Sequence, residues 1–469
     1  MEPFENISPL DARYIGPDEA MRKRMAPYLS EAASIRYQLK VEVALLETMA
    51  EFGICPTSVP ESARQAAENI TAKEVFEEEK RIGHNVRALV NSMRKRMPEN
   101  ERGFVHLFAT SNDILDTSRS LAFRDFASEI LIPDLIDLVS VISGKAREYA
   151  SVRQIGRTHG QYAEPITFGY ALSLYVSRIG GRTVALDRAR EDLRGKLSGA
   201  VGAHNALALH DPMNPAIFER KHLERLGLKA SDTQVSTQVI EPEAMADFVF
   251  QGILAMSAMA NLADDMRHLI RSEIGEVKIV DGATRVGSST MPHKVNPVAF
   301  ENVKSLWKAF APRIVTVLMD QISEHQRDLT NSASSRFLGE ILAAVDYAAV
   351  RLGGAMKKIR PDEEALGRHL AACRDQIVAE PLYVILALSG HPDGYGKVRS
   401  LLKDAGESES TLLQAAGKDR ETAKILEGIP PHQAKVIEDP TSYTGDAAER
   451  ALHTCDEWEK TLGLLRDSG

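Results

Sequence analysis

The stretch from Met245 to Ile270, MADFVFQGILAMSAMANLADDMRHLI, decides the fold class of this chain. Its apolar and small residues recur at alternating steps of four and three, the pattern of a helix that buries one long stripe. The stripe consists of Met245, Val249, Gly252, Met256, Met259, Ala263, Met266 and Ile270. As one helix the stretch is about 39 Å long, and only other long helices beside it can bury such a stripe. The pattern therefore predicts an extended helical bundle.

The same spacing recurs elsewhere in the chain, at Leu131, Leu135, Leu138 and Ile142, and roughly at Phe337, Ile341, Val345, Leu352 and Met356. A row of small residues would let a further helix, from this chain or another subunit, pack closely: Ala255, Ala258, Ala260 and Ala263. We interpret the methionines as core residues rather than as the lining of a cofactor site. Strand signals are few, and aromatic residues make up only 6% of the chain. We predict an all-α fold with an N-terminal helical domain (1–111), a central long-helix bundle (112–364) and a C-terminal helical domain (365–469).

The overall composition narrows the class of protein. With 57 Lys and Arg against 66 Asp and Glu, the net charge is −9, which argues against a general nucleic-acid binder. The three cysteines form no CxxC pair, so neither a disulfide framework nor a structural zinc site is expected. No secretory signal pattern opens the sequence, and no uninterrupted apolar run is long enough to span a membrane. We expect a soluble, cytoplasmic protein with no membrane partner.

Several familiar catalytic motifs are missing from the chain, which has no GxxxxGK[ST] loop, no GxGxxG after a strand, no HExxH and no GxSxG. Three polar segments instead interrupt the helical pattern: His106 to Ser118 (HLFATSNDILDTS), Gly156 to Gly169 (GRTHGQYAEPITFG) and Gly287 to Pro297 (GSSTMPHKVNP). One interpretation makes them caps and turns, since Thr110, Ser111 and Asp113 can all cap a helix. The other is binding or catalysis, because such polar clusters are unfavourable in a bundle unless they are hydrogen-bonded.

The third segment has the side chains of an anion site. Gly287 lets the backbone turn tightly, so that Ser288 and Ser289 can offer consecutive N–H groups as an anion-binding nest does. Lys294 adds a positive charge and Asn296 a neutral donor. Together these groups suit a carboxylate, and they would stabilise negative charge that develops on it during a reaction. Such surroundings also make a serine hydroxyl a better base.

The sequence GSSTMPHKVNP resembles the signature loop of the fumarase/aspartase superfamily, whose members eliminate fumarate from a succinyl-bearing substrate. Within it, TSNDILDTS, GRTHGQYAEP and the opening SPLDARY (Ser8 to Tyr14) are similar to segments of the adenylosuccinate lyase family. The resemblance implies three all-α domains and a homotetramer whose active sites each combine segments of three subunits. It also implies elimination of fumarate from adenylosuccinate and from SAICAR, the succinylated aminoimidazole carboxamide ribotide of purine biosynthesis. No metal or organic cofactor is implied.

The resemblance also assigns roles to individual residues. Ser288 matches the general base that removes a proton from the succinyl carbon, and His159 matches the general acid that protonates the departing nitrogen. The residues implied in carboxylate binding and carbanion stabilisation are Thr110, Ser111, Thr158, Ser289, Lys294 and Asn296. Those implied beside the acid are His84 and Glu301, and those implied in other substrate contacts are Gln238 and Asn302. Phosphate binding, for which the arginine fork is suited, falls to Arg13, Tyr14, Arg327, Ser332 and Arg336.

Two positions depart from the family pattern. The family usually has His-Asp where this chain has His84-Asn85. An amide cannot orient its neighbour by charge, so Asn85 joins the substrate-binding residues with its role open. Phe108-Ala109 replaces the Gly-containing pair more often found before Thr-Ser, and neither change touches the implied acid or base.

Other interpretations of these residues stay open. A carboxymuconate cycloisomerase shares the Thr-Ser-x-Asp and loop patterns, although its bacterial forms generally lack the histidine matched by His159. From another class, the chain could be a non-catalytic structural relative. The residues whose joint presence argues against that role are Ser288, Lys294, Asn296 and His159. Taken alone, Arg327 and Arg336 would be solvated surface charges and His159 a structural histidine.

Overall fold

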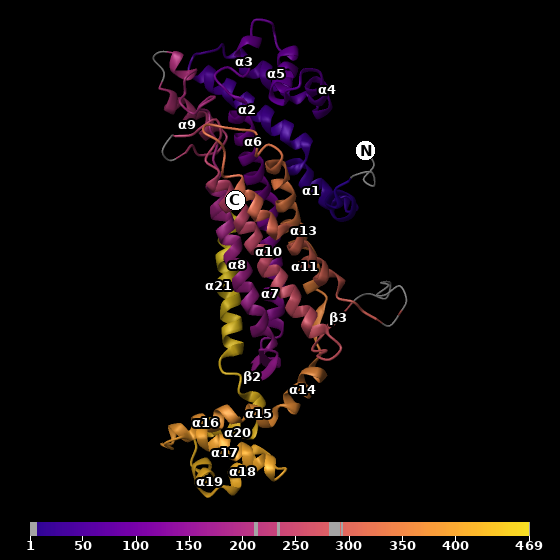
Figure 1. The fold of residues 1–469 in the computed structure, drawn as a ribbon, viewed down its shortest axis with the longest axis vertical. Coiled ribbons are helices and arrows are strands. Elements are labelled where there is room, and N and C mark those ends of the chain that lie inside the picture. Colours follow the sequence, from indigo (N-terminus) through magenta and orange to yellow (C-terminus); the bar gives the residue numbers. More distant parts are fainter. Residues whose placement is uncertain (1–6, 211–213, 232–234, 281–290, 292–293, 469) are drawn as a thin grey trace.

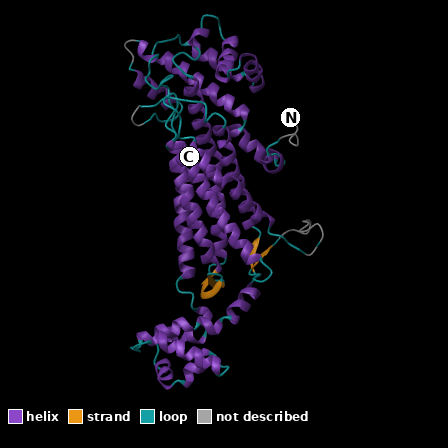
Figure 2. Ribbon diagram, in the orientation of Figure 1, coloured by secondary structure: helices purple, strands orange, loops and turns teal. Residues whose placement is uncertain are grey.

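The computed structural model describes residues 7–210, 214–231, 235–280, 291 and 294–468 of the chain. The molecule is elongated, with short N-terminal helices at one end, long helices side by side in the middle and a cluster of short helices at the other end (Figure 1). Within the described residues almost all regular structure is helical, and the strands form two small two-stranded sheets (Figure 2). This confirms the all-α prediction.

The helices fall into three groups along the long axis. The N-terminal group consists of α1 (Glu19–Leu29), α2 (Glu31–Glu51), α3 (Ser58–Glu68), α4 (Ala72–Ile82) and α5 (Asn85–Arg96). The central bundle consists of α6 (Ser111–Phe126), α7 (Ile132–Glu148), α8 (Phe168–Glu191), α10 (Glu243–Ile270), α11 (Val298–Phe310), α13 (Leu338–Met356) and α21 (Ala447–Ser468). Two shorter helices complete the arrangement: α9 (Pro215–Arg225) packs against α2 at the N-terminal end, and α12 (Ile314–Met319) packs against α10 (Figure 1). The C-terminal group consists of α14 (Glu363–Ala372), α15 (Arg374–Ile377), α16 (Ala379–Leu388), α17 (Gly394–Glu407), α18 (Leu412–Lys418), α19 (Arg420–Glu427) and α20 (Pro431–Glu438).

Helix α10 lies inside the bundle and confirms the long helix that its spacing predicts. The six inner positions of its stripe are buried, and Met245 and Ile270 at the two ends are half-buried. The helix packs against α8, α11 and α13, so the stripe is core. By length and composition α10 is apolar enough to cross a membrane, but 61% of its apolar window is buried inside the protein. Such burial is what a core helix of a bundle requires.

Helices α6 and α7 form one nearly continuous rod. They are joined by a π-helical turn, Ala127–Leu131, directly before Pro133 in the first turn of α7. Proline has no N–H for the i to i−4 bond and its ring crowds the preceding turn, so the wider turn accommodates it. At 1.5 Å per residue, the rod from Ser111 to Glu148 is about 55 Å long.

The second polar segment folds as a hairpin of β1 (Arg153–Thr158) and β2 (Gln161–Thr167). β3 (Val277–Ile279) pairs antiparallel with β4 (Ile359–Pro361), which follows only after α13 in the chain. The sequence pattern did not predict these strands, because they are short and β1–β2 shows no clear alternation of apolar and polar residues. Both strand pairs lie where the bundle meets the C-terminal helices (Figure 1).

The C-terminal helices leave the bundle after β4, and the chain then returns to it. Helix α21 packs against α7 and α8, far from α17 and α18 (Figure 1). The predicted division at residues 111 and 364 stays a prediction. The return of α21 means that the last stretch of the chain contributes to the long-helix core.

Candidate functional site

His159 stands at the tip of the β1–β2 hairpin. Thr158 pairs with Gln161, so His159 and Gly160 are the two central turn residues, with φ of 53° and 76°. Two positive φ angles define a type I′ turn, which glycine adopts freely and a histidine only with strain. The His159 side chain is exposed, and within the described part of the chain its imidazole has no hydrogen-bond partner. His159 is therefore no part of the core, and the turn presents its ring at the surface of the chain.

The first polar segment begins α6 at the other end of the rod. Thr110 is the N-cap, and its backbone N–H donates to Asp113 Oδ2 at 2.7 Å in a capping box. Asp113 is fully buried and also forms an ion pair with Lys196, whose side chain is only 2% exposed. The capping interpretation is therefore correct for Thr110 and Asp113, while Ser111 is the first helical residue and is half-buried.

Two other candidates lie near this end of α6. The N–H of Ile240, two residues after Gln238, donates to Asp116 Oδ2 at 3.3 Å. Burial raises the pKa of the Asp116 carboxyl, and the positive charge of Arg327 is among those that oppose the rise. Arg327 therefore lies near Asp116. Its Nε is buried and has no hydrogen-bond partner among the described residues.

The proposed phosphate-binding residues of the N-terminus lie beside α13. Arg13 and Tyr14 belong to a π-helical turn, Leu10–Ile15, in which Arg13 is exposed. The Tyr14 ring meets that of Tyr347 on α13 edge-on at 5.4 Å. Arg336 is exposed in a 3₁₀ turn (Ser334–Phe337) that leads into α13, and Ser332 is exposed just before it.

His84 and Asn85 begin helix α5 in the N-terminal group. His84 is the N-cap, and its Nδ1 accepts a hydrogen bond from the N–H of Arg87 at 3.3 Å. Asn85 Oδ1 accepts from the N–H of Val86 at 2.8 Å. The amide is thus engaged with backbone, and the His84 ring stays exposed.

The signature segment is described only in part. Ser288 and Ser289 lie outside the described residues, whereas Lys294 is exposed and Asn296 is half-buried. Glu301 is exposed on the first turn of α11, and the neighbouring Asn302 has a buried Oδ1 without a partner among the described residues.

A single chain does not bring all these residues together. Thr110 and Ser111 lie at one end of the α6–α7 rod, and the hairpin with Thr158 and His159 follows its other end, about 55 Å away. One chain thus holds partial sets of candidates at separate places.

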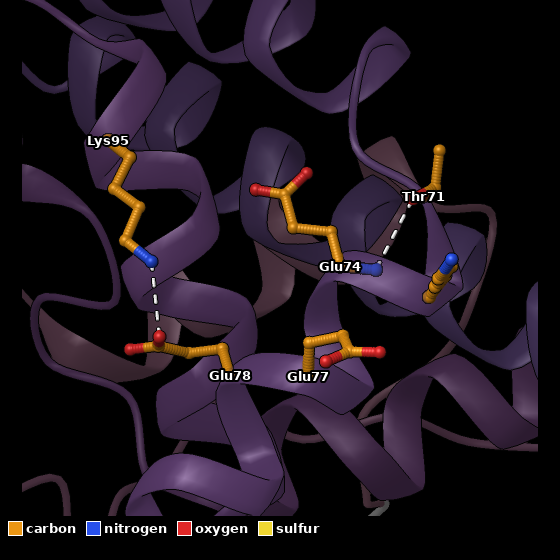
Figure 3. Close-up of a pocket in the computed structure, with 6 residues that line it drawn as sticks. Thr71, Glu74, Glu77, Glu78 and Lys95 are labelled. Carbon is orange, nitrogen blue, oxygen red and sulfur yellow. Dashed lines mark hydrogen bonds and ion pairs between the residues drawn. The ribbon is translucent and has the colours of Figure 1, made fainter.

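Two surface hollows of the described part of the chain do not coincide with the candidates. One, of about 430 Å³, lies between α4 and α5 (Figure 3) and is lined by Thr71, Lys73, Glu74, Glu77, Glu78 and Lys95. Another, of about 380 Å³, lies near β4 and is lined by Tyr149, Lys278, Arg360, Pro361, Asp362, Glu363 and Glu364. Neither includes a predicted site residue.

Buried charges at the base of the hairpin were missed by the sequence analysis. Glu276 is fully buried and binds Arg157, two residues before His159, with Nη2 to Oε1 at 2.5 Å. The sequence analysis also missed Lys196, which pairs with Asp113. Both were missed because nothing in sequence spacing distinguishes a buried lysine or glutamate from an exposed one, and only the fold shows which charges pair.

The chain is similar to known lyases over its whole length. A family model described as "Lyase" matches residues 12–309, and one described as "Adenylosuccinate lyase C-terminal" matches residues 323–432. An adenylosuccinate lyase of Pyrococcus abyssi is 32% identical, with 95% of this chain and 100% of that relative covered. An adenylosuccinate lyase of Bacillus subtilis is 29% identical, with 83% and 88% covered.

Solved structures share the fold. A fumarate lyase from Mesorhizobium aligns with a TM-score of 0.79 at 20% identity, covering 92% of this chain and 97% of that one. A 3-carboxy-cis,cis-muconate lactonizing enzyme from Pseudomonas putida aligns with a TM-score of 0.78 at 23% identity, covering 93% and 98%. At these identities the likeness concerns architecture, and it supports the fumarase/aspartase fold.

Proposed function

This chain belongs to the adenylosuccinate lyase family, whose members are carbon–nitrogen lyases, and we propose that it acts in purine nucleotide biosynthesis. The reaction is β-elimination of fumarate from adenylosuccinate, which leaves AMP, and from SAICAR, which leaves the aminoimidazole carboxamide ribotide. The observation that carries the proposal is the 32% identity to an adenylosuccinate lyase along the entire length of that relative. A carboxymuconate substrate has no comparable support, because the lactonizing enzyme is similar in fold alone.

We assign the two proton transfers to Ser288 and His159. Ser288 removes the proton from the succinyl carbon beside a carboxylate, and the electron pair moves onto the carboxylate oxygens. The pair then forms the double bond of fumarate as the carbon–nitrogen bond breaks, and His159 gives a proton to the departing nitrogen. Histidine is the side chain that most often delivers a proton in this way, and the exposed His159 ring is free to meet a substrate.

The remaining candidates bind the substrate in this proposal. The succinyl end is assigned to Thr110, Ser111, Thr158, Ser289, Lys294 and Asn296. The positions beside it or against base and sugar are assigned to His84, Asn85, Gln238 and Asn302, and Glu301 has a supporting role beside His159. Residues assigned to the phosphate are Arg13, Tyr14, Arg327, Ser332 and Arg336. The buried Nε of Arg327, which has no acceptor within the part of the chain that the structure describes, supports an anionic ligand, since a buried donor without an acceptor is costly. The scheme requires no metal or cofactor.

The active unit is a cytoplasmic homotetramer in this proposal, with each site shared between subunits. The length of the α6–α7 rod supports shared sites, because Thr110 of one chain cannot reach His159 of the same chain. An apolar stripe on and after α12 supports association: Val315, Leu318, Met319 and Ile322 are each more than half exposed. Side chains of this kind at helical spacing are typical of a surface that another subunit covers.

Fumarate release tests the proposal directly. The purified protein should release fumarate from adenylosuccinate and from SAICAR, and Ser288→Ala should bind substrate without turnover. His159→Gln should also lose elimination. If a well-folded wild type released no fumarate but acted on a carboxymuconate, the carboxymuconate would be the substrate of this site and the proposed function would be wrong. Turnover by Ser288→Ala would remove the base role from that serine.

A further inference from the structure

The tip of the β1–β2 hairpin has little to hold it in place. The strand register shifts between Ile155 and Arg157, and beyond this bulge only two cross-strand pairs remain before the turn. Thr158, His159, Gly160 and Gln161 are all exposed, so no apolar packing fixes the direction of the tip. An exposed two-residue turn on such a short ladder needs an anchor if it is to hold a side chain still.

Arg157, two residues before His159, is held in place by contacts with the rest of the protein. Its guanidinium donates to both oxygens of Glu276, at 2.5 Å and 3.1 Å, and the Glu276 side chain is fully buried. Two parallel bonds from a planar fork fix the orientation of the donor as well as its distance. The guanidinium also lies over the ring of Tyr162 on β2, 5.3 Å from its centroid.

Two further donors complete the Glu276 cluster, which consists of Glu276, Arg157, Gln154 and His369. Gln154 Nε2 donates to Glu276 Oε2 at 2.8 Å, and His369 Nδ1 lies 2.6 Å from Oε1. Burial alone would raise the pKa of Glu276, but the bonds from Arg157, Gln154 and His369 hold it below its ordinary value. The carboxylate is therefore ionised, and it ties β1 to α14.

The position of Glu276 in the chain gives the cluster a second connection. Glu276 directly precedes β3, and its carbonyl accepts from the N–H of Asp362 at the start of α14 at 2.8 Å. The segment that contains Ser288 begins shortly after β3 ends. One residue thus connects two parts of the site: its buried carboxylate holds the arginine next to the His159 turn, and its backbone carbonyl holds the start of the strand that precedes the signature segment.

We propose that Glu276 is a positioning residue for the elimination, acting through Arg157 on the direction of His159. This rests on the proposed function, because it takes His159 as the acid. Glu276→Gln should keep the shape of the cluster but replace one acceptor oxygen by an N–H₂ that faces the same donors. A displacement of about 1 Å at a catalytic group can cost about 100-fold in rate. We expect kcat to fall about 10- to 100-fold, with KM changed less than about 3-fold, since most binding groups lie on other segments.

A matched control exists between α4 and α5. Glu78 is also buried, at 6% exposure, and it too accepts from three side chains, those of Arg81, Asn91 and Lys95. Figure 3 shows the contact with Lys95. Arg81 binds it through two nitrogens, as Arg157 binds Glu276. Glu78→Gln is thus the same chemical change at a cluster far from the hairpin of the same chain. Its partners Asn91 and Lys95 lie in the second half of α5, away from His84 at the start of that helix, so its kcat should stay near that of the wild type.

The experiment measures fumarate release from adenylosuccinate and thermal melting for the wild type, Glu276→Gln, Arg157→Lys and Glu78→Gln. Arg157→Lys keeps the positive charge but loses the two-pronged guanidinium contact with Glu276. It therefore tests the positioning role if Glu276→Gln does not fold. A selective fall in kcat for the hairpin variants, absent in Glu78→Gln, supports the positioning role. Wild-type kcat in folded Glu276→Gln and Arg157→Lys, or equal falls in all three variants, overturns it. A wild type that releases no fumarate instead overturns the proposed function, and this role with it.

Discussion

Replacing Lys196 by methionine should destabilise the protein by about 3 kcal/mol. The ammonium is only 2% exposed and pairs with Asp113, whose carboxylate is fully buried. Removing one partner of a buried pair typically costs about 3–5 kcal/mol, because the remaining charge is left uncompensated. The lower end applies here, since Asp113 still accepts from the N–H groups of Thr110, Ser198 and Gly199 at 2.7, 3.1 and 3.2 Å.

The opposite substitution should cost more. In Asp113→Asn the Lys196 ammonium stays buried without a counter-charge, and only neutral acceptors remain beside it, the new amide oxygen and the carbonyl of Gly199 at 3.5 Å. The upper end of the range, about 5 kcal/mol, therefore applies. The double variant removes both charges, so its cost should fall well below the sum of the single costs.

Chemical denaturation at one fixed protein concentration measures these differences, because subunit association also contributes to stability. Lys23→Met is the control: Lys23 and Glu19 are 72% and 68% exposed and lie 2.8 Å apart. That exposed pair should contribute less than about 0.5 kcal/mol. A Lys196→Met cost as small as that of Lys23→Met would refute the argument, and so would strict additivity in the double variant.

Three further predictions concern pH, backbone and substrate. Burial lowers the pKa of His222 to about 4 from its ordinary 6.5, so the unfolded chain takes up a proton first as the pH falls. Stability should drop by about 2 kcal/mol between about pH 7.5 and about pH 5, and His222→Gln should flatten this slope in denaturation curves; an equal slope would exclude His222 as its source. Gly160→Ala meets no atom within 4 Å but keeps a φ of 76°, so it should cost about 1–2 kcal/mol and slow fumarate release; unchanged melting and rate would argue against the turn as drawn. Arg336→Ala should raise KM for adenylosuccinate far more than it lowers kcat, and a constant KM would remove Arg336 from phosphate binding.

The fold could be predicted from the sequence because one regular pattern dominates it. The stripe of α10 is buried at its inner positions, and Leu135, Leu138 and Ile142 of α7 are buried as their spacing predicts. Phe337 is the exception: it continues the spacing of α13 but is 53% exposed, because it precedes that helix in a 3₁₀ turn. Periodicity reports which face of a helix is apolar, and it does not report where the helix begins.

The candidate site could be predicted only where a motif carried it. His159 was identified from GRTHGQ, yet its exposed place on a type I′ turn was not, because β1 and β2 lack an alternating pattern. The Glu276 cluster was missed because Arg157 meets partners 119 and 212 residues away in the chain. Each of its members is of a residue type that is usually found at the protein surface, and only the tertiary fold shows that these residues converge.

The position of the candidate residues follows from the physics of long helices. Inside a helix every backbone donor and acceptor is paired, so free N–H groups, caps and tight turns occur at the ends. Thr110 and His159 therefore lie at opposite ends of the α6–α7 rod, about 55 Å apart, and no bending of a packed bundle can join them. Two bundles packed antiparallel would place the Thr110 end of one beside the His159 end of the other. In the tetramer that we propose, subunit association is then a condition of catalysis. Variants that stay monomeric, so that the Val315–Ile322 stripe is left uncovered, should lose turnover while their helices stay folded.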